Sequence, residues 1–366
     1  MKVCHLTSAH PRKDNRIFYK NCVSLSQWYE VYLIVADGLG DEFDKGIQII
    51  DAGKKRAGRF SRMLFSTYEV YKKAKKVNAD IYHFHDPELL PYALKLQKKG
   101  KKVIYDVHED LPKQVLSKHW IPSFLRKTVS GLVTKIEKHA AQKFSGIVTA
   151  DEAPYLRFQK YQKEKTILTY NYPIKGMFKN TDFAEKNQNS LCYVGGLTKI
   201  RGIREMVEAV GSMEVEFHLA GAYSPLSFRD ELVNLSGWKK VAEYGFVGPE
   251  EVQKIYSKSS IGLVMLHPTE KYKEALPVKM FEYMSAGLVV LASDFPMWKE
   301  ILKKYECGLT ADPLKPEDIR EKIKYLLENP QLCREMALNG IKAIETELNW
   351  STQAEKLRHL YAGLKD

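Results

Sequence analysis

The sequence predicts an α/β fold of two domains, each built on a mainly parallel β-sheet. Short apolar segments alternate with helical patterns in both halves of the chain, and this alternation is typical of parallel sheets covered by helices. A polar stretch at 174–189 interrupts the alternation and is interpreted as an interdomain linker. The length of 366 residues is sufficient for two domains with large cores.

The first domain is expected to span 1–173. Its predicted strands are Lys2–Ser8, Glu30–Asp37, Gln48–Asp51, Ile81–Asp86, Lys102–Glu109, Gly146–Asp151 and Thr166–Asn171. Helical patterns lie between most of them. Ligands of such sheets bind at the carboxyl ends of the strands, so functional residues are expected in the loops that directly follow strands.

The second domain is expected to span 190–349, with a last helix at 350–366. The predicted strands begin with one that leads from Ser190 into a Gly-Gly turn. The others are Glu214–Gly221, Val241–Phe246, Ile261–Leu266, Leu288–Asp294 and Cys307–Asp312. Helices are expected from Lys315 to Glu347.

The stretch 274–294 is the most informative part of the sequence. Pro277 suits the first turn of a helix, where its missing N–H costs nothing, and Gly287 suits the position just after a helix. A helix of about ten residues is therefore expected from Pro277 to Ala286, followed by a buried strand.

Two carboxylates flank the start of this expected helix. Glu274 should lie in the loop before it, and Glu282 more than one turn inside it. Between them, the backbone N–H groups near Ala275 and Leu276, with the charge of Lys279, would form an anion site. This order of charges suits a diphosphate flanked by a ribose and a hexose. Two solvated glutamates on a surface helix would show the same spacing.

The run Glu-Ala-Leu-Pro-Val-Lys-Met-Phe-Glu, followed by Tyr-Met-Ser-Ala-Gly and a Val-Val-Leu-Ala-Ser-Asp strand, resembles the donor site of family 4 of the retaining glycosyltransferases. The resemblance implies the GT-B fold: two Rossmann-like domains facing each other across a cleft, with a C-terminal helix that crosses back to the first domain. It also implies that Glu274 lies beside the donor sugar as a catalytic residue, and that Glu282 binds the ribose.

Further donor contacts follow from the same resemblance. Gly195, Gly196 and Arg201 correspond to a phosphate-binding turn, although the family usually has Arg at position 196 and Lys at position 201. Ala275, Leu276 and Lys279 are assigned to the same diphosphate. Val247 lies in the segment whose backbone contacts the base. The donor is expected to carry UDP or GDP rather than ADP, and no other cofactor is expected.

Two neighbouring strands of the first half end in polar clusters. His85 and Asp86 end one strand and are assigned to acceptor binding, and His108 follows the next. A family His at the latter position contacts the donor sugar, so His108 is assigned a catalytic role, with a purely structural histidine as the alternative. No metal dependence is expected, because no Asp-x-Asp occurs and the basic cradle supplies positive charge.

The segment His10-Pro-Arg-Lys-Asp-Asn-Arg-Ile-Phe18 resembles a subgroup common among bacterial surface-polysaccharide transferases. Within it, Arg16 is assigned to a phosphate or an acceptor. Asp14 is interpreted as a helix cap. The resemblance as a whole implies transfer to a glycan or lipid-linked acceptor with retention of configuration.

The positive charge is concentrated in the first half. Residues 1–173 hold 31 Lys and Arg against 18 Asp and Glu, whereas the rest hold 26 against 27. Basic segments with aromatic residues at 54–76 and 113–143 suggest contact with an anionic membrane, although solvated basic helices would show the same pattern. Nucleic acid is not expected, because no recognised binding module accompanies the charge.

The expected location is cytoplasmic, with peripheral contact to the inner face of the plasma membrane. No apolar run is long enough to cross a bilayer, and five scattered cysteines suggest reduced thiols. Three alternatives stay open: a nucleotide-sugar epimerase, a phosphorylase on the same fold, and an inactive partner subunit, which the glycine at position 196 would favour.

Overall fold

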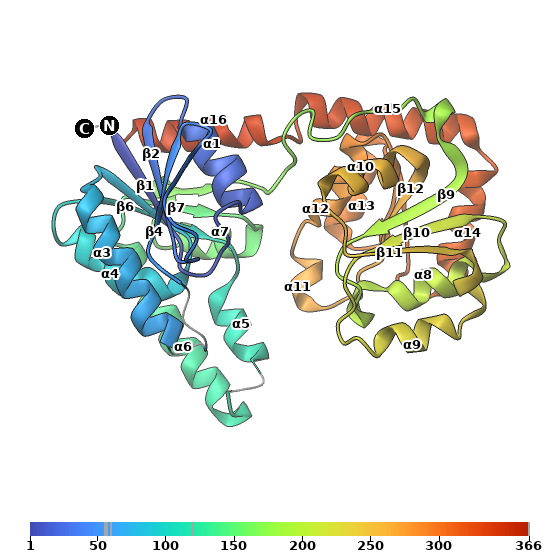
Figure 1. The fold of residues 1–366 in the computed structure, drawn as a ribbon. Helices are drawn as coiled ribbons and strands as arrows, with labels where there is room; N and C mark the ends of the chain where they lie inside the picture. Colours follow the sequence, from blue (N-terminus) through green and yellow to red (C-terminus); the bar gives the residue numbers. More distant parts are fainter. Residues whose placement is uncertain (55–57, 59–60, 119–120, 365–366) are drawn as a thin grey trace. The chain divides into compact units, whose positions relative to one another are not determined.

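The computed structural model describes the whole chain except residues 55–57, 59–60, 119–120 and 365–366. The chain divides into two compact units, one formed by residues 1–171 with 351–366 and the other by residues 172–350. Each unit is an α/β domain built on a single sheet (Figure 1). The predicted fold class, with two parallel-sheet domains, is confirmed.

The first unit has an eight-stranded sheet in the order β3-β4-β2-β1-β5-β6-β7-β8. All neighbours are parallel except β3 and β4. The strands are β1 (Lys2–Leu6), β2 (Glu30–Val35), β3 (Glu42–Asp44), β4 (Ile47–Asp51), β5 (Ile81–Phe84), β6 (Lys102–Val107), β7 (Gly146–Thr149) and β8 (Thr166–Leu168).

Helices pack on this sheet and bury its apolar core. In the core, the ring centroids of the stacked side chains of Phe84 and Tyr105 lie 4.6 Å apart. The helices are η1 (Asn15–Cys22), α1 (Val23–Leu25), η2 (Arg62–Ser66), α3 (Thr67–Val77), η3 (Pro87–Leu89), α4 (Leu90–Gln97), α5 (Leu111–Ser117), α6 (Ser123–Ala141), α7 (Glu152–Gln159), η4 (Lys163–Lys165) and α16 (Trp350–Ala362). From Ser351 onward, α16 belongs to this unit, so the chain returns to its first domain at the end.

The second unit has a six-stranded parallel sheet in the order β11-β10-β9-β12-β13-β14. Its strands are β9 (Asn187–Val194), β10 (Glu216–Ala220), β11 (Val241–Gly245), β12 (Ser259–Val264), β13 (Val289–Ser293) and β14 (Gly308–Ala311). In Figure 1, α8 and α9 lie below this sheet and α15 lies above it.

The helices of the second unit come between and after these strands. They are η5 (Phe183–Glu185), η6 (Lys199–Arg201), α8 (Ile203–Ala209), η7 (Val210–Ser212), α9 (Phe228–Val233), η8 (Ser236–Lys240), α10 (Pro249–Lys258), α11 (Glu270–Lys273), α12 (Val278–Ser285), α13 (Pro296–Tyr305), α14 (Pro316–Leu327) and α15 (Pro330–Thr346). The apolar faces of α8, α14 and α15 contribute to one core with β9, β10, β12 and β13.

The expected helix at 277–286 is present as α12, which begins one residue later, with Pro277 as its N-cap. Gly287 has a φ of +69°, a left-handed conformation that a side chain disfavours, so it ends the helix as expected. The predicted helix-ending role of Gly287 is confirmed.

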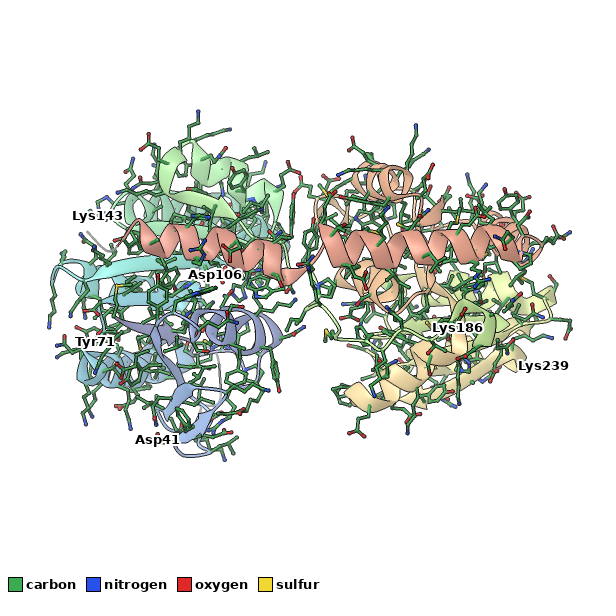
Figure 2. The ribbon with its side chains drawn as sticks, turned by 90° about the horizontal axis from the view of Figure 1, so that it is seen from above. Asp41, Tyr71, Asp106, Lys143, Lys186 and Lys239 are labelled. Atoms are coloured by element: carbon green, nitrogen blue, oxygen red, sulfur yellow. The ribbon has the colours of Figure 1, made fainter. Side chains whose placement is uncertain are left out.

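Two features differ from the predictions. The antiparallel strand β3 forms a hairpin with β4 through Lys45 and Gly46, both at positive φ, and is too short for its alternation to be recognised. The predicted linker is packed into the second unit: Phe178 lies against Tyr256, and Lys186 donates from Nζ to the Tyr256 carbonyl at 2.7 Å. Figure 2 labels Lys186 in this unit. Burial lowers the pKa of Lys186 to about 8.

Across the described residues, none of the helices combines the length and apolar character needed to span a bilayer.

Candidate functional site

The predicted donor residues gather around a hollow of about 270 Å³ in the second unit. It lies where β9 and β12 end and α12 begins, at the carboxyl edge of the sheet. Four residues predicted to bind the donor line it: Arg201, Ala275, Leu276 and Lys279. The first N–H groups of α12 have no intrahelical acceptors, so the hollow combines backbone donors with three cationic side chains, those of Arg201, Lys271 and Lys279.

A larger hollow of about 500 Å³ lies elsewhere in the same unit, between α13, β14 and α15. None of the predicted site residues lines it. Size alone does not identify a ligand site. The smaller hollow has the chemistry of an anion site, whereas the larger one mixes Lys299 and Lys303 with Glu306 and Glu335 on an open surface.

Arg201 is held in place by two features that the sequence did not reveal. Tyr193 Oη lies 3.4 Å from Arg201 Nη1 and donates to the Gly196 carbonyl at 3.1 Å, so one phenol fixes both the cation and the glycine turn. Gly202, at a φ of +69°, lies so close to Met265 that an added Cβ would be 1.9 Å from its carbonyl oxygen. A side chain at position 202 would therefore push the Arg201 turn away from β12.

The Arg201 guanidinium covers the glycine turn. An added Cβ at Gly196 would lie 3.7 Å from Arg201 Nε, and one at Gly195 would lie 3.6 Å from Arg201 Nη1. The cation of residue 201 thus occupies the space above position 196, where the family usually carries its own Arg. Arg201 stands where the family usually has Lys, so the turn still has one positive charge fewer than the family pattern.

Trp298 is another residue that sequence reasoning missed. Its indole Nε1 donates to the Ala275 carbonyl at 2.8 Å, and the side chain is fully buried. A buried tryptophan needs such a partner, and this one anchors the segment between Glu274 and α12. Its position shortly after a predicted strand was the only available signal.

The two predicted glutamates occupy different environments. Glu274 is the C-cap of α11 and is partly buried. Glu282 is buried, and its Oε2 accepts hydrogen bonds from Lys279 Nζ at 2.6 Å and from Tyr256 Oη at 3.1 Å. Ribose binding by Glu282 stays a prediction, in which the second carboxylate oxygen would accept the hydroxyl. Val247 lies half-buried after β11 and does not line the hollow, so its contact with a base is untested.

In the first unit, a fully buried carboxylate organises the predicted residues. Asp106, which is labelled in Figure 2, is the last residue but one of β6 and is fully buried. Its oxygens lie 3.0 Å from Arg16 Nη2, 3.2 Å from His85 Nδ1 and 3.4 Å from His108 Nε2. Burial alone would raise the pKa of Asp106, but Arg16 and His108 hold it well below the usual range.

The structure gives Arg16 a role inside the domain, and the contact predicted for it with a phosphate or an acceptor stays untested. The side chain is buried, and its guanidinium also donates to the carbonyl and hydroxyl oxygens of Thr169, each at 2.9 Å. Arg16 therefore neutralises Asp106 inside the domain and is not exposed to an acceptor. The helix-cap role expected of Asp14 is present, since its carboxylate accepts from the N–H groups of Arg16 and Ile17.

His85 and Asp86 are also buried, so the acceptor contacts predicted for them are not supported by their placement. Burial lowers the pKa of His85 to about 3, which keeps the ring neutral between His5 and His108. Both residues act through neighbours: His85 contacts His108, and Asp86 contacts His10.

His108 is the predicted residue that reaches the surface at this edge, with 19% of its side chain exposed. Its Nε2 faces Asp106 and His85, at 3.4 and 3.1 Å. A carboxylate that accepts from one ring nitrogen fixes the tautomer and leaves the other nitrogen for a substrate. This arrangement suits a residue that contacts a sugar hydroxyl.

A buried trio could in principle hold a metal ion: His83, His85 and Asp106 present nitrogen and oxygen atoms within 4.8 Å of one another. The Asp106 charge is already neutralised by Arg16. A divalent cation there would be buried beside a guanidinium, which is electrostatically unfavourable. We therefore interpret the cluster as a hydrogen-bonded network.

Comparisons with known proteins agree with the geometry. The family description "Glycosyl transferases group 1" matches residues 178–343, and "Glycosyltransferase Family 4" matches residues 22–171. The chain carries two glycosyltransferase domains. They coincide with the second and first structural units, and the hollow and the histidine cluster each lie in one of them.

Relatives of this glycosyltransferase are distant. It is 24% identical over 204 residues to the uncharacterized glycosyltransferase MJ1178 of Methanocaldococcus jannaschii, covering 56% of this chain and 55% of that protein. It is 23% identical over 291 residues to the D-rhamnosyltransferase WbpZ of Pseudomonas aeruginosa, covering 77% of this chain and 72% of that protein.

Solved structures show the same GT-B fold. Sucrose-phosphate synthase from Thermosynechococcus elongatus superposes with a TM-score of 0.77 at 15% identity, covering all of this chain and 99% of that one. Alr3699/HepE of Anabaena, solved in complex with UDP and glucose, superposes with a TM-score of 0.73 at 13% identity, covering 99% of this chain and all of that one.

Proposed function

We propose that this glycosyltransferase moves a sugar from a nucleoside-diphosphate donor to a glycan or lipid-linked acceptor, with retention of configuration, in the synthesis of a cell-surface polysaccharide. The observation that carries the proposal is the hollow at the start of α12, where Arg201 and Lys279 join backbone N–H groups. A structural neighbour that binds UDP and UDP-glucose supports a UDP-type donor.

The proposed chemistry uses fixed positive charge instead of a metal ion. Arg201, Lys279 and the N-terminal end of α12 stabilise the departing diphosphate, as donors already oriented in a partly closed hollow do in other enzymes. Because three cationic side chains and a helix terminus line the hollow, no divalent ion is needed to balance the leaving group. Glu274 positions the donor sugar and stabilises the charge that develops on it. In the first unit, His108 contacts a sugar hydroxyl.

Transfer with retention of the anomeric configuration can follow two routes. A two-step route requires a nucleophile on the sugar face opposite the leaving group, and we assign no such residue. We favour attack on the same face as the departing phosphate, which then takes the acceptor proton. This route requires donors that hold the phosphate in place, a task suited to Arg201 and Lys279.

Arg201→Ala should weaken binding of the nucleoside diphosphate at least about tenfold, which corresponds to about 1.4 kcal/mol. The alanine removes the cation above the glycine turn and leaves the fold intact, since the side chain is only half-buried. Calorimetry with UDP and GDP measures the effect. Lys199→Ala is the matched control, because that lysine is largely exposed and pairs with Glu231. An unchanged dissociation constant in Arg201→Ala contradicts the assigned site.

The same experiments separate the alternatives. An inactive partner subunit would bind no nucleoside diphosphate or would bind it without turnover. An epimerase would convert a labelled nucleotide sugar without any acceptor, and a phosphorylase would require inorganic phosphate. A thermal-shift screen of UDP, GDP, ADP and CMP identifies the base, since a bound ligand raises the melting temperature by mass action.

We also propose that the first unit lies against an anionic membrane on its cytoplasmic side, through α6. Leu125, Val129, Leu132 and Ile136 are spaced four, three and four residues apart, which places them on one helix face. Leu125, Leu132 and Ile136 are exposed, as is the neighbouring Phe124 at 79%. Figure 1 shows α6 extending from the body of this unit beside α5.

Basic residues accompany this apolar face: Arg126, Lys127 and Lys135 lie on the same helix. Such a combination of exposed apolar side chains and cations is suited to the headgroup region of an anionic bilayer.

A double variant, Phe124→Ser with Leu132→Ser, should lose most of its binding to vesicles of phosphatidylglycerol. The free energy of membrane binding falls by about 0.8 kcal/mol for each CH₂ group that is no longer buried in the bilayer. Co-sedimentation of the full chain measures the bound fraction. Leu338→Ser, an exposed leucine on α15, is the control and should bind as the natural sequence does. Equal binding by the double variant and the control excludes α6 as the contact.

A further inference from the structure

The strand β14 forms one edge of the six-stranded sheet, and its outer side carries free backbone groups. It lies parallel to β13, its single neighbour in the sheet. The carbonyl oxygens of Cys307 and Ala311 accept hydrogen bonds from N–H groups of the β13 segment. Because alternate residues of a strand direct their backbone groups to opposite sides, the N–H and C=O groups of Gly308 and Thr310 point away from β13.

These outward groups of Gly308 and Thr310 have no hydrogen-bond partner within the part of the chain that the structure describes. The free stretch ends at Asp312, whose N–H donates to Asp318 Oδ2 at 2.8 Å. Residues 308–310 are partly exposed, whereas β13 is buried throughout. The edge at β14 is therefore open to a further strand.

The other outer strands of the two sheets are protected by charged side chains. Glu42 on β3 and Glu243 on β11 each form an ion pair with an arginine. The carbonyl group of Leu168, at the end of β8, accepts from Lys356 Nζ at 3.1 Å. In contrast, the β14 sequence Gly-Leu-Thr-Ala contains neither a charged residue nor a proline. Natural sheets usually protect their edges by such means, so an unprotected edge indicates a pairing surface.

The hollow of about 500 Å³ between α13, β14 and α15 lies at this edge, and residues 308–310 line it. Its apolar part comes from Leu302, Leu309, Leu332 and Met336. Its charged side chains are all exposed: Lys299, Lys303, Glu306 and Glu335. Among the described residues, none of these charged side chains has an ion-pair partner. The surface beside β14 thus combines an apolar floor with unpaired charges of both signs in equal number.

We infer that a second copy of this chain pairs with β14, so that two six-stranded sheets join edge to edge in a symmetric dimer. An antiparallel pairing about a two-fold axis at Leu309 places Gly308 opposite Thr310 of the partner subunit, and Thr310 opposite the partner's Gly308. Residues opposite each other in this way exchange both of their N–H···O bonds. All of the outward groups of Gly308 and Thr310 are then paired in both subunits.

The charges around the hollow favour a copy of the chain over a partner of one charge sign. In a two-fold interface the same patch faces itself, so equal numbers of cations and anions allow Lys to lie opposite Glu across the axis. A strongly acidic or basic partner would instead bring like charges together on one half of the patch. The inference is independent of the proposed function, because no residue assigned to the donor or the acceptor takes part in it.

The dimer is tested with the full chain by analytical ultracentrifugation over a wide range of concentrations. Thr310→Pro removes an N–H group that β13 does not use, so the subunit should stay folded, as a thermal melt would verify. It should raise the dissociation constant of the dimer at least about tenfold. Thr310→Val is the matched control, because it keeps the N–H group and the shape of the side chain, and it should dimerise as the natural chain does.

A second pair of variants tests the register of the pairing. With the axis at Leu309, the two copies of this residue form a non-hydrogen-bonded pair whose Cα atoms lie about 4.5 Å apart, which is within the range for a disulfide. Leu309→Cys should therefore give a covalent dimer on mild oxidation. Thr310→Cys is the control and should not be crosslinked, because its two copies are offset along the strands. The natural cysteines are all buried, so the natural chain should also stay uncrosslinked.

Three results would overturn the inference. A natural chain that stays monomeric at every concentration shows that the edge does not receive a second copy. A dimer that is equally strong in Thr310→Pro must form through another surface. A Leu309→Cys chain that dimerises but gives no covalent dimer on oxidation excludes a two-fold axis at this residue.

Discussion

Asp106→Ala should lower the free energy of unfolding by about 3–5 kcal/mol, the cost of removing one partner of a buried ion pair. Asp106 is fully buried, and its carboxylate is the counter-charge of Arg16, at 3.0 Å, and the acceptor for Asn21 Nδ2, also at 3.0 Å. The alanine would leave the Arg16 guanidinium without a carboxylate inside the domain. Denaturant unfolding followed by circular dichroism measures the loss.

A double variant separates the charge effect from lost packing. Arg16→Met with Asp106→Leu removes both charges and should be more stable than Asp106→Ala, because it leaves no uncompensated ion. The double variant would still lack the group that orients His108, so its turnover should stay low although its fold recovers. If Asp106→Ala had the same free energy of unfolding as the natural chain, Asp106 would not be needed to neutralise the buried Arg16.

The pattern of apolar segments was enough to predict the fold because both sheets are built from continuous buried strands. The positions of the strands other than β3, the helix at 277–286 and its end at Gly287 follow from periodicity, from the restricted backbone of Pro277 and from the permissive backbone of Gly287. The polar residues 187–189 were wrongly predicted to belong to the linker. They form the start of β9, which pairs through its backbone while its side chains face solvent. Backbone hydrogen bonding cannot be predicted from the types of side chain present.

The sequence located the polar residues that follow the strands but did not show which of them are buried. Arg16, His85 and Asp86 were assigned to the acceptor because they lie near the right sheet edge, yet all three are inside the domain. A charged residue is interpreted as exposed unless its partner is known, and the partners of Arg16 are 90 and 153 positions away in the chain. His10 was overlooked for the same reason, since its partner Asp86 is also far from it in the chain.

Glu274→Gln should lower the turnover number at least about tenfold, or about 1.4 kcal/mol in the activation barrier, with little change in the affinity for UDP. Glu274 lies one residue before Ala275, whose carbonyl is fixed by Trp298, so its backbone is anchored at the rim of the hollow. Glutamine keeps the size of the side chain and removes its negative charge. A charge that stabilises a developing oxocarbenium-like sugar acts in the transition state and hardly in the ground state, so its loss reduces kcat and leaves binding unchanged.

The matched control is Glu270→Gln on the preceding helix, whose side chain is largely exposed and pairs with Lys273. Both substitutions remove one negative charge from α11 or its end, so a general electrostatic effect would change the two variants alike. A specific effect at the reacting sugar should appear only in Glu274→Gln. Full turnover in Glu274→Gln would remove Glu274 from the reacting centre. Equal losses in both variants would show that the net charge of α11 acts instead of a carboxylate placed beside the donor sugar.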